Sequence, residues 1–190
     1  MAIAERLTLE EFLALPEEEP SLEYEDGRVT QKVSPMGKHS MSQVVVADLF
    51  NAYGRAKRLS LALTELRSTY AGYSRVPDVS VYRWDRIPVD ESGEIANNFR
   101  DPPDIAIEIV SPGQSVNYLV RRCLWYVDNG ALAALLLDPS DESVLLIRPN
   151  QPMVGLRGPD QIDLQDILPG FQLTVEAIFD ALVIRPKEES

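Results

Sequence analysis

Two short runs in the middle of the chain have the alternating pattern of β-strands, and each carries an acidic residue. Asp78 lies in RVPDVSVY (residues 75–82), and Glu108 lies in PDIAIEIV (residues 103–110). Because a strand alternates its side chains between two faces, each carboxylate points away from its apolar neighbours. If the two strands pair, the carboxylates converge. Such a pair favours a hard divalent cation with oxygen ligands and predicts a site for phosphodiester cleavage.

The same alternation also fits a sheet with one face in solvent. Antiparallel sheets commonly alternate apolar and charged positions for that reason alone. The alternation by itself therefore does not separate a functional pair of acids from a solvated surface. The order of the surrounding helices and strands has to decide between these two interpretations of the acidic residues.

Length and composition predict a single domain over residues 1–190. The chain has 190 residues, of which 45% are hydrophobic, enough for a sizeable core. It contains no run of about 20 uncharged apolar residues and does not start like a signal peptide. We expect a soluble, cytoplasmic protein without a membrane partner. Cys123 is the only cysteine, which excludes an intrachain disulfide and a cysteine-based zinc site and predicts a core thiol.

The net charge of −12 at pH 7 opposes binding to nucleic acid, because lysine and arginine supply most non-specific affinity for phosphate. The charge is unevenly distributed. Residues 1–27 hold 1 basic and 9 acidic residues, residues 28–86 hold 10 and 4, and residues 87–190 hold 7 and 17. The middle segment is therefore basic.

A basic segment that includes Asp78 suits a phosphate track beside a metal site. Lys38, His39 and Arg75 are its candidate contacts to nucleic acid. Two simpler interpretations stay open. Basic residues on a helix or strand usually form a solvated face, and a histidine at a helix start can be exposed or act as a cap.

The remaining pattern predicts helices and strands in mixed order, an α/β fold. Capping signals and helical spacing predict helices at residues 8–15, 38–58, 114–128 and 175–182. Alternation and turn residues predict a hairpin at 22–32 and strands at 59–66, 132–137 and 143–148. The polar segment 90–98 is expected to be an exposed loop.

Several motifs in this order resemble a known family. They are Glu23 before the Asp-Gly turn, VPDVSVY at 76–82, IAIEIVSP at 105–112, and Tyr126 followed by Gly130 and LDP. The set is similar to restriction-endonuclease-like proteins of the PD-(D/E)XK nuclease superfamily, long catalogued as a domain of unknown function. The resemblance runs from about residue 7 to residue 182. It implies a restriction-endonuclease-like core with a central mixed β-sheet flanked by α-helices, plus an N-terminal helix and hairpin.

The resemblance also implies a metal site. Asp78 would be the motif aspartate and Glu108 the motif glutamate, with the backbone carbonyl of Ile109 as a further ligand to Mg²⁺ or Mn²⁺. Glu23 would support the ion or its water. A bound ion lowers the pKa of a water molecule and aligns it for in-line attack. The implied function is a metal-dependent endonuclease acting on DNA, and a homodimer is expected because cutting both strands needs two sites.

The chain departs from the superfamily at the motif lysine. Two residues after Glu108 the motif has Lys, whereas this chain has Val110. In many relatives the lysine lies instead on the following helix, at the position of Arg122. An arginine can stabilise a pentacovalent phosphate but cannot accept a proton. Gln114 could position a water molecule or simply cap the helix.

Two alternatives from other classes stay open. The first is a catalytically inactive nuclease fold that binds nucleic acid through its basic segment without cutting it. The second is an interaction protein whose acidic surface and hairpin mediate assembly. The sequence contains no Gly-x-Ser-x-Gly elbow, phosphate-binding loop or dinucleotide fingerprint, so serine hydrolysis and nucleotide-driven chemistry are not supported.

Overall fold

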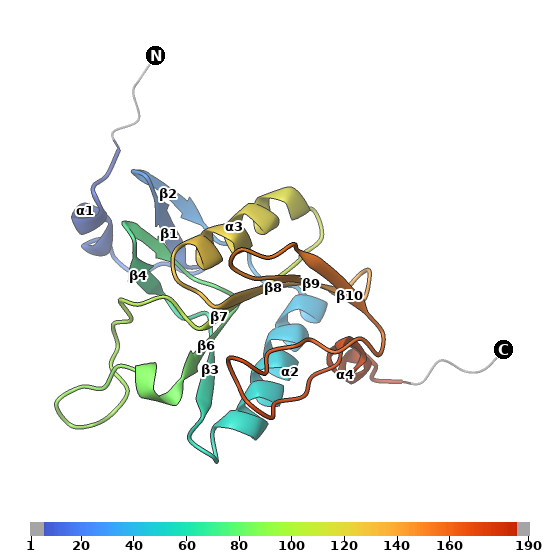
Figure 1. The fold of residues 1–190 in the computed structure, drawn as a ribbon. Helices are drawn as coiled ribbons and strands as arrows, with labels where there is room; N and C mark the ends of the chain where they lie inside the picture. Colours follow the sequence, from blue (N-terminus) through green and yellow to red (C-terminus); the bar gives the residue numbers. More distant parts are fainter. Residues whose placement is uncertain (1–5, 186–190) are drawn as a thin grey trace.

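The computed structural model describes residues 6–185, which form two β-sheets packed with helices (Figure 1). The larger sheet has six strands: β3 (Ser60–Thr64), β6 (Val79–Arg83), β7 (Ile105–Ile109), β8 (Ala133–Asp138), β9 (Ser143–Ile147) and β10 (Val154–Arg157). The smaller sheet has four: β1 (Leu22–Glu25), β2 (Arg28–Gln31), β4 (Ser68–Tyr70) and β5 (Tyr73–Arg75). The α-helices are α1 (Leu9–Leu13), α2 (Gly37–Gly54), α3 (Val116–Asp128) and α4 (Val175–Phe179).

The larger sheet is mixed, as predicted. Its order is β10-β9-β8-β7-β6-β3. Strands β7 and β8 are parallel, and α3 makes the crossover between them, whereas every other neighbouring pair is antiparallel. In the smaller sheet, β1 and β2 form the predicted hairpin. No helix within residues 6–185 is long and apolar enough to cross a membrane.

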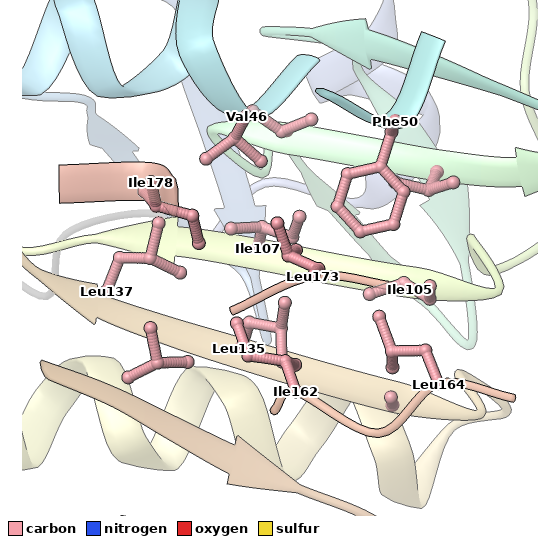
Figure 2. Packing of buried hydrophobic residues seen from close by; sticks show 14 of the residues in the cluster. Val46, Phe50, Ile105, Ile107, Leu135, Leu137, Ile162, Leu164, Leu173 and Ile178 are labelled. Atoms are coloured by element: carbon pink, nitrogen blue, oxygen red, sulfur yellow. The ribbon is translucent and has the colours of Figure 1, made fainter. Parts of the chain in front are cut away.

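One face of the larger sheet packs under α2, α4 and the irregular segment 158–174. Alternate residues of β7 and β8 point to this side, where they meet side chains of α2 and of the irregular segment (Figure 2). The labelled members of this cluster are Val46, Phe50, Ile105, Ile107, Leu135, Leu137, Ile162, Leu164, Leu173 and Ile178. Side chains from distant parts of the sequence therefore share one core.

The opposite face of the larger sheet is also covered. Ala106 and Ala134 leave room for α3, whose Cys123 and Tyr126 are fully buried against them. Glu108 lies on this same face and is 2% exposed. The interpretation of a sheet with one solvated face is therefore wrong, and the predicted core position of Cys123 is confirmed.

Several boundaries differ from the sequence-based expectations. The run 75–82 is not one strand, because β5 ends at Arg75, β6 begins at Val79, and Pro77 between them has no amide to donate to a ladder. The long helix stops at Gly54 instead of residue 58. There the chain turns back so closely that a Cβ on Gly54 would lie 2.1 Å from the Ser60 hydroxyl oxygen.

Candidate functional site

A pocket of about 110 Å³ opens where the two sheets meet the first turn of α2 and the helix α3. Ten of its twelve lining residues have a polar group in the side chain, and they come from both sheets, both helices and the segments beside them: Glu23, Thr30, Gln31, Lys32, Val33, His39, Asp78, Glu108, Gln114, Tyr118, Leu119 and Arg122. Asp78, Glu108, Glu23, Arg122, Gln114 and His39 were expected at the site, and the fold brings all six to this pocket. Lys32, which the sequence placed only within the basic segment 28–86, lines the pocket as well.

Asp78 stands directly before β6, and its carboxylate makes three polar contacts. The antiparallel register of Val79 with Ile107 places Asp78 opposite Glu108. One carboxylate oxygen, Oδ2, accepts a hydrogen bond from the Ile109 amide at 2.7 Å. The other, Oδ1, lies 2.8 Å from Lys32 Nζ and 3.3 Å from His39 Nε2.

These contacts keep Asp78 ionised although it is 3% exposed. Burial raises the pKa of its carboxyl group, but the hydrogen bond from His39 and the charge of Lys32 outweigh burial and lower the pKa to about 2. Because the Asp78 carboxylate is already ionised without a metal, it does not have to lose a proton before it binds a cation.

Glu108 is held through one oxygen only. Its Oε1 accepts hydrogen bonds from Tyr126 Oη at 2.6 Å, Arg122 Nε at 3.0 Å and Arg122 Nη2 at 2.9 Å. Among residues 6–185, Oε2 takes part in no hydrogen bond, and Glu108 lines the pocket. Burial raises the pKa of Glu108, with Arg122 opposing the rise and Asp78 adding to it. A divalent cation in the pocket would lower that pKa again.

Arg122 joins Glu108 to Glu23. Its Nη1 and Nη2 donate to Glu23 Oε2 and Oε1 at 2.6 and 2.9 Å, the two-pronged arrangement that arginine and carboxylate favour. Glu23 Oε1 also accepts from the Val76 amide at 2.7 Å. Burial raises the pKa of Glu23, but Arg122 outweighs burial and lowers it. Both oxygens of Glu23 are therefore engaged.

Lys32 follows β2 and reaches across to the acids of the larger sheet. Its Nζ lies 2.8 Å from Asp78 Oδ1 and also 2.8 Å from Glu65 Oε2. Glu65 follows β3, and its Oε1 lies 2.5 Å from Gln43 Nε2 on α2. Sequence reasoning missed Glu65 and Gln43 and counted Lys32 only as one member of the basic segment. One signal was available: His39 and Gln43 are polar residues at i and i+4, on one face of a helix that packs on the sheet.

The remaining predicted residues have mixed surroundings. His39 is buried, with Nδ1 2.8 Å from the Ser111 hydroxyl, so the exposed interpretation is wrong. Lys38 beside it is exposed. Arg75 is 4% exposed, with its guanidinium 4.5 Å from the Trp125 ring centroid and an ion pair to Glu25, and it does not line the pocket.

Gln114 lines the pocket, whereas Ile109 is buried and does not line it. Gln114 Oε1 accepts from the Ser111 amide at 3.0 Å, while the helix cap of α3 is Ser115. The Ile109 amide points toward Asp78. In an extended residue the amide and the carbonyl project to the same side, so the Ile109 carbonyl oxygen faces that side as well.

The donor atoms fit a divalent cation. His39, Glu65 and Asp78 each offer one ligand atom, and these atoms all lie within 4.8 Å of one another. Glu108 is not a member of this group but lines the same pocket, and its Oε2 makes no hydrogen bond within the described residues. Carboxylate and carbonyl oxygens suit Mg²⁺ and Mn²⁺. The position of the Lys32 ammonium between two carboxylates is direct evidence that the pocket accommodates positive charge.

A mixed sheet flanked by helices, with one buried acid directly before β6 and another facing it on β7, defines a restriction-endonuclease-like α/β protein. The chain belongs to the Uma2 family, described as "putative restriction endonuclease", which matches residues 9–176. It is similar to the crystal structure of "a putative nuclease belonging to DUF820" from Anabaena variabilis ATCC 29413. The two chains share 38% sequence identity and a TM-score of 0.88, over 93% of this chain and 99% of that chain.

A second solved structure is only weakly similar. The cryoEM structure of a DrdV–DNA complex has 12% identity and a TM-score of 0.33, over 78% of this chain and 14% of that chain. That likeness is too low to support an argument. No curated protein matches the sequence. The family and the structure with 38% identity therefore define the class of this protein as nuclease-like.

Proposed function

We propose that this protein is a metal-dependent endonuclease that hydrolyses phosphodiester bonds in DNA. The observation that carries the proposal is the placement of two buried carboxylates beside one pocket: Asp78 directly before β6, and Glu108 opposite it on β7. Membership of a nuclease-like family supports the same chemistry. A polar pocket that combines carboxylates with nearby cations suits a phosphate diester better than an apolar substrate.

Asp78, Glu108 and the Ile109 carbonyl would hold Mg²⁺ or Mn²⁺, and Glu65 and His39 could complete the set of ligands. The bound ion lowers the pKa of a water molecule and offsets the charge on the leaving oxygen. Glu108 suits this role because three hydrogen bonds fix Oε1 and leave Oε2 for the ion.

Arg122 and Glu23 support this site by orienting Glu108. Arg122 is 5% exposed and donates to both Glu23 and Glu108, so its contacts favour a positioning role. The interpretation of Arg122 as a substitute for the motif lysine, in contact with phosphate, stays a prediction. Gln114 lines the pocket, and its role in positioning a water molecule stays a prediction as well.

The path of the DNA would pass the first turn of α2. A second hollow of about 520 Å³ adjoins the metal pocket, shares His39 and Gln114 with it, and is also lined by Lys38. Lys38 is exposed there and could contact a phosphate. The basic Arg75 is buried away from the pocket and would act on the fold instead. The expected homodimer stays a prediction.

The test is magnesium-dependent nicking of supercoiled plasmid DNA. Asp78→Asn keeps the shape of the side chain but removes its charge, so we expect the nicking rate to fall at least about 100-fold. Asp48→Asn is the matched control, because Asp48 lies exposed on α2 outside the pocket. This control should nick DNA at the wild-type rate.

Equal nicking by Asp78→Asn and the wild type would contradict the proposal and locate the activity elsewhere.

A second function is favoured by one observation: Val110 occupies the place of the motif lysine. On that account the chain binds nucleic acid without cutting it. Metal-independent DNA binding by the wild type, with no nicking, would support this inactive binding module.

A further inference from the structure

Lys32 is the one lysine that lines the metal pocket. It comes from the end of the β1–β2 hairpin, 46 residues before Asp78 in the sequence. Its backbone amide donates to the Ser21 carbonyl at 2.9 Å, which anchors the main chain at this point. The side chain is the mobile part: a four-carbon stem with an ammonium group that can rotate.

The ammonium group of Lys32 lies between the carboxylates of Asp78 and Glu65 and balances their negative charge. Its distances of 2.8 Å to Asp78 Oδ1 and to Glu65 Oε2 are those of direct ion pairs. Both of these oxygens belong to residues that could also bind a metal. An ammonium and a divalent cation cannot share the same carboxylate oxygens at close range, because two positive charges a few ångströms apart repel by several kcal/mol at an effective dielectric constant of about 20.

The side chain of Arg122 is held more firmly than that of Lys32. Its guanidinium donates to both oxygens of Glu23 and to Glu108, and these contacts would have to break before it could reach a substrate. Lys32 has fewer contacts to lose and lies in the same pocket as the candidate metal ligands. Of the two cations that line the pocket, Lys32 is the one that can change partners.

We propose that Lys32 supplies, from the hairpin, the lysine that is absent from β7. Without metal, its ammonium is the internal counter-ion of Asp78 and Glu65. A divalent cation held by Asp78 and Glu65 would take the place of the ammonium at these oxygens, and Lys32 would then be free to contact the phosphate of the DNA substrate. This inference rests on the proposed nuclease function and adds a residue that moves between two positions of the same site.

Metal affinity and cleavage should respond to Lys32→Met in opposite directions. Removing the competing ammonium should tighten Mn²⁺ binding, measured by calorimetry, by about tenfold or more. Removing the phosphate contact should slow plasmid nicking about 100-fold or more. A residue with only a structural role would weaken both. Lys57→Met is the matched control, because Lys57 lies past the far end of α2, where it contacts the Tyr53 ring.

Folding is checked in the same variants. Without metal, Lys32→Met should unfold at a lower temperature than the wild type, because Asp78 loses a buried partner, and saturating Mn²⁺ should restore more of its stability than it adds to the wild type. Lys32→Arg keeps the positive charge, so its Mn²⁺ affinity should stay at or below the wild-type value.

Unchanged or weaker Mn²⁺ binding by Lys32→Met would overturn the counter-ion role, and nicking at the wild-type rate would overturn the phosphate contact. A wild-type chain that binds Mn²⁺ but cuts no DNA contradicts the proposed nuclease function alone. In that case the comparison of Mn²⁺ affinities still decides whether Lys32 competes with the metal.

Discussion

At the scale of single residues, the candidate site depends on how charge is balanced around two buried acids. Asp78 is compensated by Lys32, His39 and a backbone amide, and Glu108 by groups on α3. Burial alone would raise the pKa of both carboxyl groups and so disfavour the charged form that binds a cation. The partners reverse this effect for Asp78, and a bound metal would do the same for Glu108.

The lowered pKa of Asp78 predicts how the stability of the metal-free protein depends on pH. The pKa falls from an ordinary value of 3.8 to about 2 in the folded chain, so ionised Asp78 stabilises the fold at any pH above about 4. This contribution, roughly 2 kcal/mol, should be lost as the pH falls from about 4 through 2. Urea unfolding of the wild type and Asp78→Asn over this range measures it.

Other acids also titrate in this pH range, so the informative quantity is the difference between the two proteins. Asp78→Asn cannot gain or lose that proton, and the difference in unfolding free energy should shrink as the pH drops. A difference that stays constant between pH 5 and pH 2 would mean that Asp78 titrates alike in the folded and unfolded chains.

At the scale of helices and strands, local patterns predicted most elements that carry the site. Alternation located β6 and β7, and helical spacing located α2 and α3, because each pattern depends on neighbouring residues. The β5–β6 break and β10 were missed. So was the irregular segment 158–174, whose six buried residues have no regular spacing and pack into the core with α2 and α4.

The same reasoning explains which site residues could be predicted. Asp78 and Glu108 interrupt apolar strands and are therefore visible in the sequence. Lys32 and Glu65 follow the ends of β2 and β3, where a charged residue is unremarkable in sequence. Only the pairing of strands and the packing of the hairpin against the larger sheet bring them to Asp78. Long-range contacts of this kind leave no local pattern.

Packing of α2 on the sheet predicts a stability effect. Phe50 is fully buried, and its ring centroid lies 4.7 Å from that of Phe171 in the irregular segment. Phe50→Ala should lower the free energy of unfolding by about 3–5 kcal/mol, because it removes a large side chain and leaves a cavity. Val44→Ala, on the exposed side of the same helix, should change it by less than about 0.5 kcal/mol. Urea titrations measure both, and equal losses would contradict this arrangement of α2.

At the scale of the whole molecule, the site lies at a junction. The smaller sheet contributes Glu23 and the hairpin that carries Lys32, the larger sheet contributes Asp78 and Glu108, and α2 and α3 close the pocket. The negative charge of the whole chain, −12, opposes contact with DNA. A cation bound at this junction would supply positive charge where the phosphate has to approach.

The central claim, that Asp78 and Glu108 hold a divalent cation, is tested most directly by anomalous diffraction from crystals grown with Mn²⁺. We predict a manganese peak within about 2.1 Å of both carboxylates, with the Lys32 ammonium moved away from Asp78. A peak bound elsewhere, or an empty pocket with Lys32 still paired to Asp78, would contradict the account.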